Sequence, residues 1–255
     1  RNEEVSNIIK SINEGMKEKI NGSVILIHGE IGIGKTRLIT HVKHLIDVNY
    51  KNILKCFYVA DYGSSFAISN LLKQVVASAD KGLLNKYKKE LSMVIPEIYG
   101  EETIDTYGDI ELKMKGNVAL MAKISLFLLE YYSEKPGVII FDNVHMYDNF
   151  TLGIIQYVLS RVMEARNISV IISYRDGDCL GNYDFTEMLT KINSKVDLEI
   201  HLTPLNEDMT SRILKNVLNV DRISESFTDL IYRHSMGNPL LVEEGIKYLR
   251  DKKVV

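Results

Sequence analysis

The chain has little of what marks a secreted, zinc-binding or membrane protein. It holds only two cysteines, Cys56 and Cys179, and neither lies in a spacing that binds zinc or builds a disulfide framework. No apolar run approaches the ~18 residues of a membrane span, and no signal peptide opens the chain. Two free thiols suit a reducing compartment, so we predict a cytoplasmic protein with no membrane partner.

Neither charge nor proline content marks a specialised segment. The 31 basic and 34 acidic residues leave a net charge of −3, so no basic footprint points to nucleic acid, and a nucleic-acid partner is not expected. Four prolines and no low-complexity tract mean that no obvious linker divides the 255 residues. The chain opens on Arg1 without a methionine and stops in mid-pattern at Val255, from which we expect an excised part of a longer protein.

Short apolar runs alternate with amphipathic segments until about residue 203. Strands are predicted at 24–27, 53–60, 137–141, 168–173 and 198–202, of which 24–27 has the continuous apolar run of a strand buried on both faces. Helices are predicted at 5–20, 36–46, 67–79, 118–132 and 152–165, with polar helical insertions and loops over 82–116. Beyond Pro204 only helices are predicted, at 207–218, 224–234 and 240–249. The pattern therefore predicts an α/β domain over 1–203 with a parallel sheet, and a helical lid over 204–255 that is truncated at its C-terminal end.

A complete phosphate-binding loop, G-x-x-x-x-G-K-[ST], follows the first predicted strand. It consists of Gly29, Glu30, Ile31, Gly32, Ile33, Gly34, Lys35 and Thr36. Glycines let the backbone curl so that successive N–H groups face phosphate oxygens, and the next helix turns its positive end toward the same anion. Lys35 is expected to reach the β- and γ-phosphates and Thr36 to hold Mg²⁺. Because a strand and a helix flank the loop, we predict an ATP and Mg²⁺ site rather than a chance glycine-rich turn.

Asp142 directly follows the third predicted strand, and a phosphate loop needs a nearby carboxylate to hold magnesium. Asp142 would lie beside the loop at the carboxyl edge of the sheet and bind the magnesium ion; the alternative is an aspartate that only caps the next turn. The next residue is Asn143, whose amide cannot take a proton from water at neutral pH, which argues against efficient hydrolysis. Asp148 is a candidate substitute, although a helix N-cap explains it equally well. His145 is expected to be structural.

Two further polar positions follow the fourth strand and open the last helix. Arg175 is a candidate sensor of the γ-phosphate, with an exposed arginine paired to Asp176 or Asp178 as the alternative. Asn238 and Pro239 suit the N-cap and the first residue of a helix, and capping alone explains both.

These motifs, in this order, resemble the AAA-type ATPase domain of the STAND class of signalling NTPases. The matching segments are GEIGIGKTRL at 29–38, FDNVHMYD at 141–148, SYRDGD at 173–178 and GNPLLVEE at 237–244. RNEE at 1–4, VIPE at 94–97 and LTPL at 202–205 also echo the family pattern, so the resemblance covers nearly the whole chain. The most similar members are the ATPase modules attached to class III adenylyl cyclases, to some protein kinases and to bacterial transcription activators.

The resemblance implies a P-loop NTPase fold with a five-stranded parallel sheet, in the order 5-1-4-3-2, and a C-terminal helical lid. It implies that Pro239 lies near the adenine and that Arg175 acts as a sensor, and Arg37 is usual after the phosphate loop. Asn143 departs from the family, which usually has a second acid there. The soluble cyclase branch also varies at this position, so the departure bears on turnover and not on binding.

The sequence thus predicts an ATP-binding regulatory ATPase switch, with weak hydrolysis, inside a larger signalling protein of the adenylyl cyclase kind. Its catalytic candidates are Lys35, Asp142, Asn143 and Arg175. ATP with Mg²⁺ would close the lid, ADP would open it, and an effector in the same full-length chain would respond. Self-association in the ATP state is also expected. The alternatives are a DNA-associated AAA-type loader and a nucleotide-binding scaffold without hydrolysis.

Overall fold

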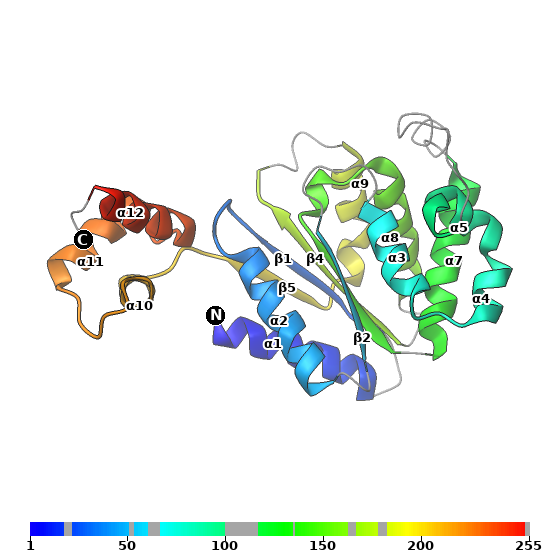
Figure 1. The fold of residues 1–255 in the computed structure, drawn as a ribbon, viewed down its shortest axis with the longest axis horizontal. Coiled ribbons are helices and arrows are strands. Elements are labelled where there is room, and N and C mark those ends of the chain that lie inside the picture. Colours follow the sequence, from blue (N-terminus) through cyan, green and yellow to red (C-terminus); the bar gives the residue numbers. More distant parts are fainter. Residues whose placement is uncertain are drawn as a thin grey trace.

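A five-stranded parallel sheet forms the centre of the computed structural model, which describes residues 1–17, 22–50, 54–60, 67–99, 117–134, 136–162, 167–177 and 183–252 (Figure 1). The strands are β1 (Val24–Gly29), β2 (Lys55–Ala60), β3 (Gly137–Asp142), β4 (Ile168–Arg175) and β5 (Leu198–Leu202). They lie in the order β2-β3-β4-β1-β5, and each neighbouring pair is parallel. Read from the other edge this is 5-1-4-3-2, so the predicted fold and strand order are confirmed.

Helices cover both faces of the sheet, which explains why the central strands β1, β3 and β4 are almost continuously apolar. On one face lie α1 (Asn2–Lys17) and α2 (Lys35–Asn49), which share a core with alternate strand residues such as Ile25 and Ile27. On the other face, α3 (Ala67–Val76), α7 (Val118–Glu134), α8 (Asn149–Val162) and α9 (Tyr183–Ile192) pack on the intervening residues, such as Leu26.

Short elements complete the described part of this α/β domain. They are α4 (Lys81–Lys86), α5 (Lys88–Val94) and the 3₁₀ turns η1 (Pro96–Ile98), η2 (Val144–Met146) and η4 (Asn193–Lys195). No helix in the described ranges has both the length and the apolar character needed to cross a bilayer.

The helix α9 was not predicted from the sequence. Its apolar face consists of Phe185, Met188 and Ile192, all buried, with Leu189 packed beside them on the same core. The stripe spans only ten residues, close to the shortest length at which a helical period can be recognised, and the helix packs on α8 and on Tyr174 of β4. Several predicted features lie outside the described residues: Ile53, 18–20, 100–116, 163–165, Asp178, Cys179 and 253–255.

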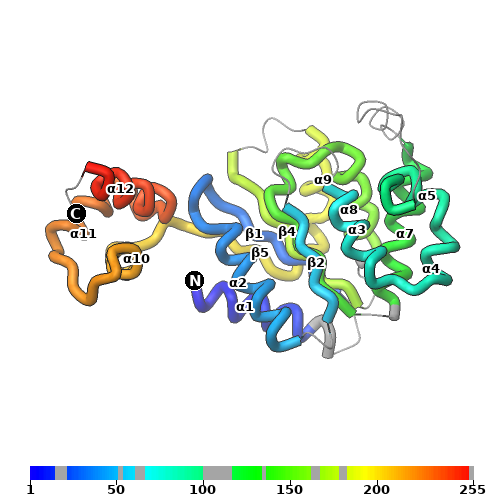
Figure 2. Tube along the Cα trace, viewed as in Figure 1, coloured from blue at the N-terminus to red at the C-terminus, as the bar shows by residue number. Residues whose placement is uncertain are grey.

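Three helices follow the sheet and form what we name the C-terminal bundle: α10 (Glu207–Leu218), α11 (Glu225–Ser235) and α12 (Pro239–Asp251). Figure 2 shows the chain leaving β5 and entering this bundle at one end of the molecule. The bundle has its own small core of Leu214, Ile231, Val242 and Ile246. Each helix begins at a side-chain cap, provided by Asn206, Ser224 and Asn238.

Candidate nucleotide-binding site

The phosphate loop runs from the end of β1 to the start of α2. Gly32 and Gly34 have φ angles of 74° and 101°, a region that residues with a Cβ rarely adopt. Gly34 is the N-cap of α2, and the helix begins directly at Lys35. The first amides of α2 carry no intrahelical partner, so this end of the helix is suited to an anion.

The Lys35 side chain is buried and folds back over its own loop. Its Nζ donates hydrogen bonds to the carbonyl oxygens of Gly29 at 2.7 Å and Glu30 at 2.8 Å. Lys35 also lines a cavity of about 420 Å³ beside the loop, which we name the phosphate-side cavity. An ammonium group has three donors, so phosphate oxygens in this cavity can take the place of the carbonyls as acceptors.

Asp142 is fully buried at the end of β3, where three hydroxyl groups donate hydrogen bonds to it. Thr36 Oγ1 and the Tyr58 hydroxyl lie 2.7 Å and 2.9 Å from Oδ2, and Ser173 donates to Oδ1. The structure therefore brings together Thr36 and Asp142, the two residues expected to hold Mg²⁺. A hydroxyl and a carboxylate beside a phosphate loop are the hard oxygen ligands that Mg²⁺ takes, so the donor set fits the ion.

Sequence reasoning did not find that Tyr58 and Ser173 contact Asp142. They come from β2 and β4, the strands on either side of β3, and only the strand order places them at the same carboxylate. Nothing in the local pattern around Tyr58 or Ser173 signals this contact.

Asn143 follows Asp142 with a left-handed backbone, at φ 59° and ψ 44°. Its backbone N–H donates to Ser173 Oγ at 3.0 Å, and the residue lines the phosphate-side cavity together with Lys35 and Arg175. An amide therefore borders the cavity at the position directly after Asp142. Left-handed backbone favours asparagine, aspartate and glycine over other residues.

Asp148, the candidate substitute base, is engaged elsewhere. Its Oδ1 accepts from the backbone N–H of Thr151 at 2.8 Å and its Oδ2 from the Thr151 hydroxyl at 2.6 Å. This is the N-cap geometry of α8, so capping is the role that the contacts support. His145 is buried in the 3₁₀ turn η2.

Arg175 ends β4 and lines the same cavity as the phosphate loop. One of its two proposed partners, Asp176, directs its carboxylate to His28 and His201. The other, Asp178, lies outside the described residues.

The C-terminal bundle contacts the phosphate loop directly. Asn238 Nδ2 donates to the carbonyl oxygen of Ile31 at 2.8 Å, and the Leu240 N–H donates to that of Gly32 at 3.3 Å. A Cβ on Gly32 would lie 2.6 Å from Leu240 Cβ, so the loop and the start of α12 fit closely. An exposed ion pair joins Arg37 to Glu243 at 2.9 Å. Asn238 also caps α12 and Pro239 is its first residue, as predicted, but the contact with the loop was not foreseen.

A second cavity, of about 790 Å³, adjoins the first. Its walls come from the start of α1, from α2 and from the bundle, and it shares Ile33, Gly34, Arg37 and Pro239 with the phosphate-side cavity. Its wall mixes apolar side chains, such as Leu38 and Ile213, with polar and charged residues: Arg1, Asn2, Glu3, Glu4, Arg37, His41, Arg212 and Asn216. Its size is typical of small-molecule sites.

Cys56 on β2 is not a candidate nucleophile. Burial, together with the negative charge of Asp47, raises the pKa of its thiol to about 12. Because the thiolate is the reactive form, this cysteine stays protonated and inert at neutral pH.

Several known structures are similar in fold to this chain. ORC2 of Aeropyrum pernix in its ADP form is 16% identical, with a TM-score of 0.57 over 95% of this chain and 60% of that chain. ORC1 of the same organism, in complex with DNA, is 14% identical, with a TM-score of 0.52; the match covers 95% of this chain and 57% of ORC1. Cdc6p of Pyrobaculum aerophilum is 13% identical, with a TM-score of 0.51 over 84% and 48%.

The chain has a P-loop NTPase fold, as predicted. No family model matches the sequence, and no curated protein matches it. The chain spans only 48–60% of the three structures, and at this identity they establish the fold alone. The narrower STAND class therefore stays a prediction.

Proposed function

We propose that the chain is an ATP-binding regulatory switch with weak ATPase activity, in which the C-terminal bundle, taken as residues 204–255, is the lid over a nucleotide-binding domain of residues 1–203. The observation that carries the proposal is the contact between α12 and the phosphate loop, through Asn238 and Leu240. A loop that rearranges around phosphate must alter these contacts, so nucleotide and lid are coupled.

The loop residues 29–36 would bind the phosphates through their backbone amides. Lys35 would exchange the carbonyl oxygens of Gly29 and Glu30 for phosphate oxygens. Thr36 and Asp142 would hold Mg²⁺, which neutralises charge on the β- and γ-phosphates. Arg175 borders the cavity where a γ-phosphate would lie, which suits a sensor.

The nucleoside would occupy the larger adjoining cavity. Pro239 and Arg37 line both cavities, so one nucleotide can span them, with its base against Pro239. ATP and ADP would then differ mainly at the loop, beside the contacts that hold α12. An effector of the adenylyl cyclase kind in the same full-length chain, and self-association in the ATP state, rest on the motif resemblance alone.

The coupling between lid and loop can be tested with two matched asparagines. Asn206 and Asn238 each cap a bundle helix, with Oδ1 accepting from Met209 N at 2.9 Å and from Leu240 N at 3.0 Å. Each alanine variant is expected to lose about 1 kcal/mol of stability with its cap. Only Asn238→Ala also loses the contact with Ile31, so only it should weaken the ATP-induced protection of α12 in hydrogen–deuterium exchange. Asn238→Asp, which keeps the cap but not the donor, should resemble Asn238→Ala.

Two results would count against this coupling. If ATP leaves exchange in α12 unchanged in the parent protein, the bundle is not a lid. If Asn206→Ala and Asn238→Ala respond to ATP identically, the contact with the loop does not transmit the signal.

A DNA-associated loader is the second candidate function, because ORC1 shares the fold and was solved in complex with DNA. The net charge of −3 weighs against it. Fluorescence anisotropy of a labelled duplex separates the two proposals. A switch should show no binding at low salt, whereas a loader should bind with an affinity that falls steeply as salt rises.

A further inference from the structure

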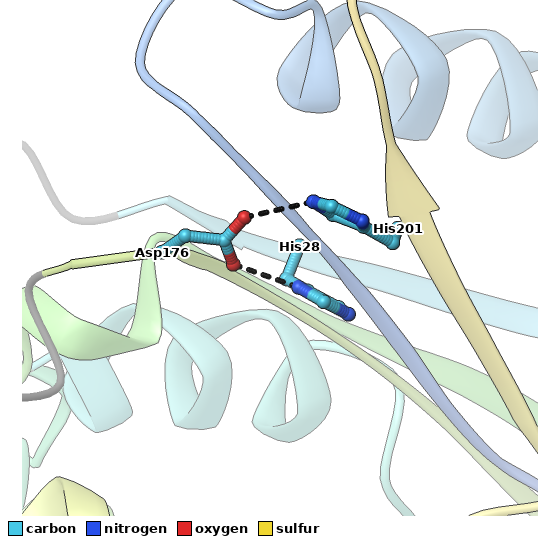
Figure 3. Close-up of side chains that lie close together, drawn as sticks. All are labelled: His28, Asp176 and His201. Carbon is cyan, nitrogen blue, oxygen red and sulfur yellow. Dashed lines mark hydrogen bonds and ion pairs between the residues drawn. The ribbon is translucent and has the colours of Figure 1, made fainter.

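Three side chains that the nucleotide site does not use meet at the carboxyl edge of the sheet (Figure 3). His28 is on β1, Asp176 directly follows β4, and His201 is on β5. Because β1 lies between β4 and β5 and pairs His28 with His201, residues far apart in sequence become neighbours. Their candidate ligand atoms all lie within 4.8 Å of one another.

The Asp176 carboxylate lies beside the two imidazoles and contacts one nitrogen of each (Figure 3). Its Oδ1 is 2.7 Å from His28 Nδ1 and its Oδ2 is 3.1 Å from His201 Nε2. The two rings stack with centroids 4.7 Å apart, and the other face of His28 stacks on Tyr174 at 5.1 Å. The His28 ring is thus held between two aromatic rings, with Nδ1 directed at the carboxylate.

The second nitrogen of His28 has a carboxylate partner of its own. Its Nε2 lies 3.2 Å from Glu199 Oε1. A neutral imidazole donates from one nitrogen and presents a lone pair at the other. Loss of the proton that lies between Nδ1 and Asp176 would expose the Nδ1 lone pair to an ion, while Nε2–H still donates to Glu199. Metal-binding histidines are characteristically oriented by such a carboxylate on the far nitrogen.

We propose that His28 Nδ1, His201 Nε2 and a carboxylate oxygen of Asp176 bind one divalent transition-metal ion, with zinc as the best fit, and that Glu199 orients His28. Two imidazoles and a carboxylate suit zinc and its neighbours, whereas magnesium takes oxygen ligands. The stacked rings of His28 and His201 are nearly parallel, so their nitrogen lone pairs point in the same direction and do not converge on one ion. Binding therefore requires the His201 ring to tilt toward Asp176. The His201 side chain is 56% exposed, which leaves room for that rotation.

A metal ion bound at this site would restrain the backbone at the start of the phosphate loop. His28 immediately precedes Gly29, and the backbone N–H of Asp176 donates to the Gly29 carbonyl at 3.3 Å. The same carbonyl accepts from Lys35 Nζ at 2.7 Å. An ion at this point therefore lies next to the loop while using none of its residues, and its binding does not depend on the proposed nucleotide function.

Cobalt(II) titration of the whole chain, stripped of metal and free of nucleotide and magnesium, tests the proposal. We expect one Co²⁺ per chain, visible absorption bands of a protein-bound ion, and displacement by Zn²⁺. His201→Ala removes a half-exposed ligand and should lower the affinity by at least about 100-fold, and Glu199→Gln by about 10-fold, the range expected for an orienting carboxylate. Asp176→Asn should also weaken binding, which gives a second ligand variant if one fails to fold.

His234→Ala is the matched control, because this exposed histidine lies on α11 in the bundle. It should bind cobalt like the parent chain. His41 and His44 lie one turn apart on α2 and are the competing chelate on the surface. The proposal is wrong if the parent binds no cobalt, if His201→Ala keeps the parent affinity, or if His44→Ala abolishes binding in its place.

Discussion

Lys35→Ala is expected to lower the affinity for ATP by at least about 100-fold. The ammonium group would make two or more charge-assisted hydrogen bonds to the phosphates, each worth about 1.5–3 kcal/mol. Since about 1.4 kcal/mol corresponds to a factor of ten, two such bonds account for the expected loss. Isothermal titration of ATP in the presence of Mg²⁺ measures the effect directly.

The control for this variant is Lys73→Ala. Lys73 is on α3, where its Nζ pairs with Glu97 at 2.6 Å, and it lines neither cavity. Its removal should leave ATP binding unchanged. Lys35→Ala also loses the hydrogen bonds to Gly29 and Glu30, so thermal unfolding without nucleotide must show that the variant is folded. A folded Lys35→Ala protein that binds ATP like the parent would refute the nucleotide proposal as a whole.

The sheet could be predicted because its central strands β1, β3 and β4 are buried on both faces. Val24–Gly29 and Gly137–Asp142 are nearly uninterrupted apolar runs, and each ends at a motif whose chemistry requires a particular place at the sheet edge. The strand order came from the motif resemblance, since burial alone does not order five parallel strands. The residues around the phosphate-side cavity could be named for the same reason, because Lys35, Asn143 and Arg175 each belong to a recognisable motif.

Contacts that depend on register between distant segments could not be predicted. Tyr58 and Ser173 reach Asp142 only because β2 and β4 flank β3. His28 and His201 are 173 residues apart in sequence and meet across one β1–β5 pair. Asn238 fulfils its capping role on its own helix, so nothing in its local pattern reveals the further hydrogen bond to Ile31. Local patterns specify the elements, whereas these contacts belong to the packed fold.

Asn143→Asp is expected to raise ATP hydrolysis by about 100-fold, the lower end of what a positioned general base contributes. The parent should turn over more slowly than about one ATP per second, below the usual enzyme range. Aspartate tolerates the left-handed backbone at φ 59° nearly as well as asparagine, so the substitution adds a proton acceptor without distorting η2. Asn143→Glu extends the carboxylate further into the cavity but strains the same backbone, so it should gain less.

Phosphate release at saturating ATP and Mg²⁺ measures the gain, and Asp148→Asn is its control. Asparagine caps a helix as well as aspartate, so this variant keeps α8 intact and removes only the alternative acid. If it lowers the hydrolysis rate, Asp148 serves as the base and its capping contacts do not describe its whole role. Parent turnover well above one per second would rule out a slow switch. If Asn143→Asp binds ATP but hydrolyses it no faster, the cavity lacks the remaining catalytic geometry, and the chain is better described as a nucleotide-binding scaffold.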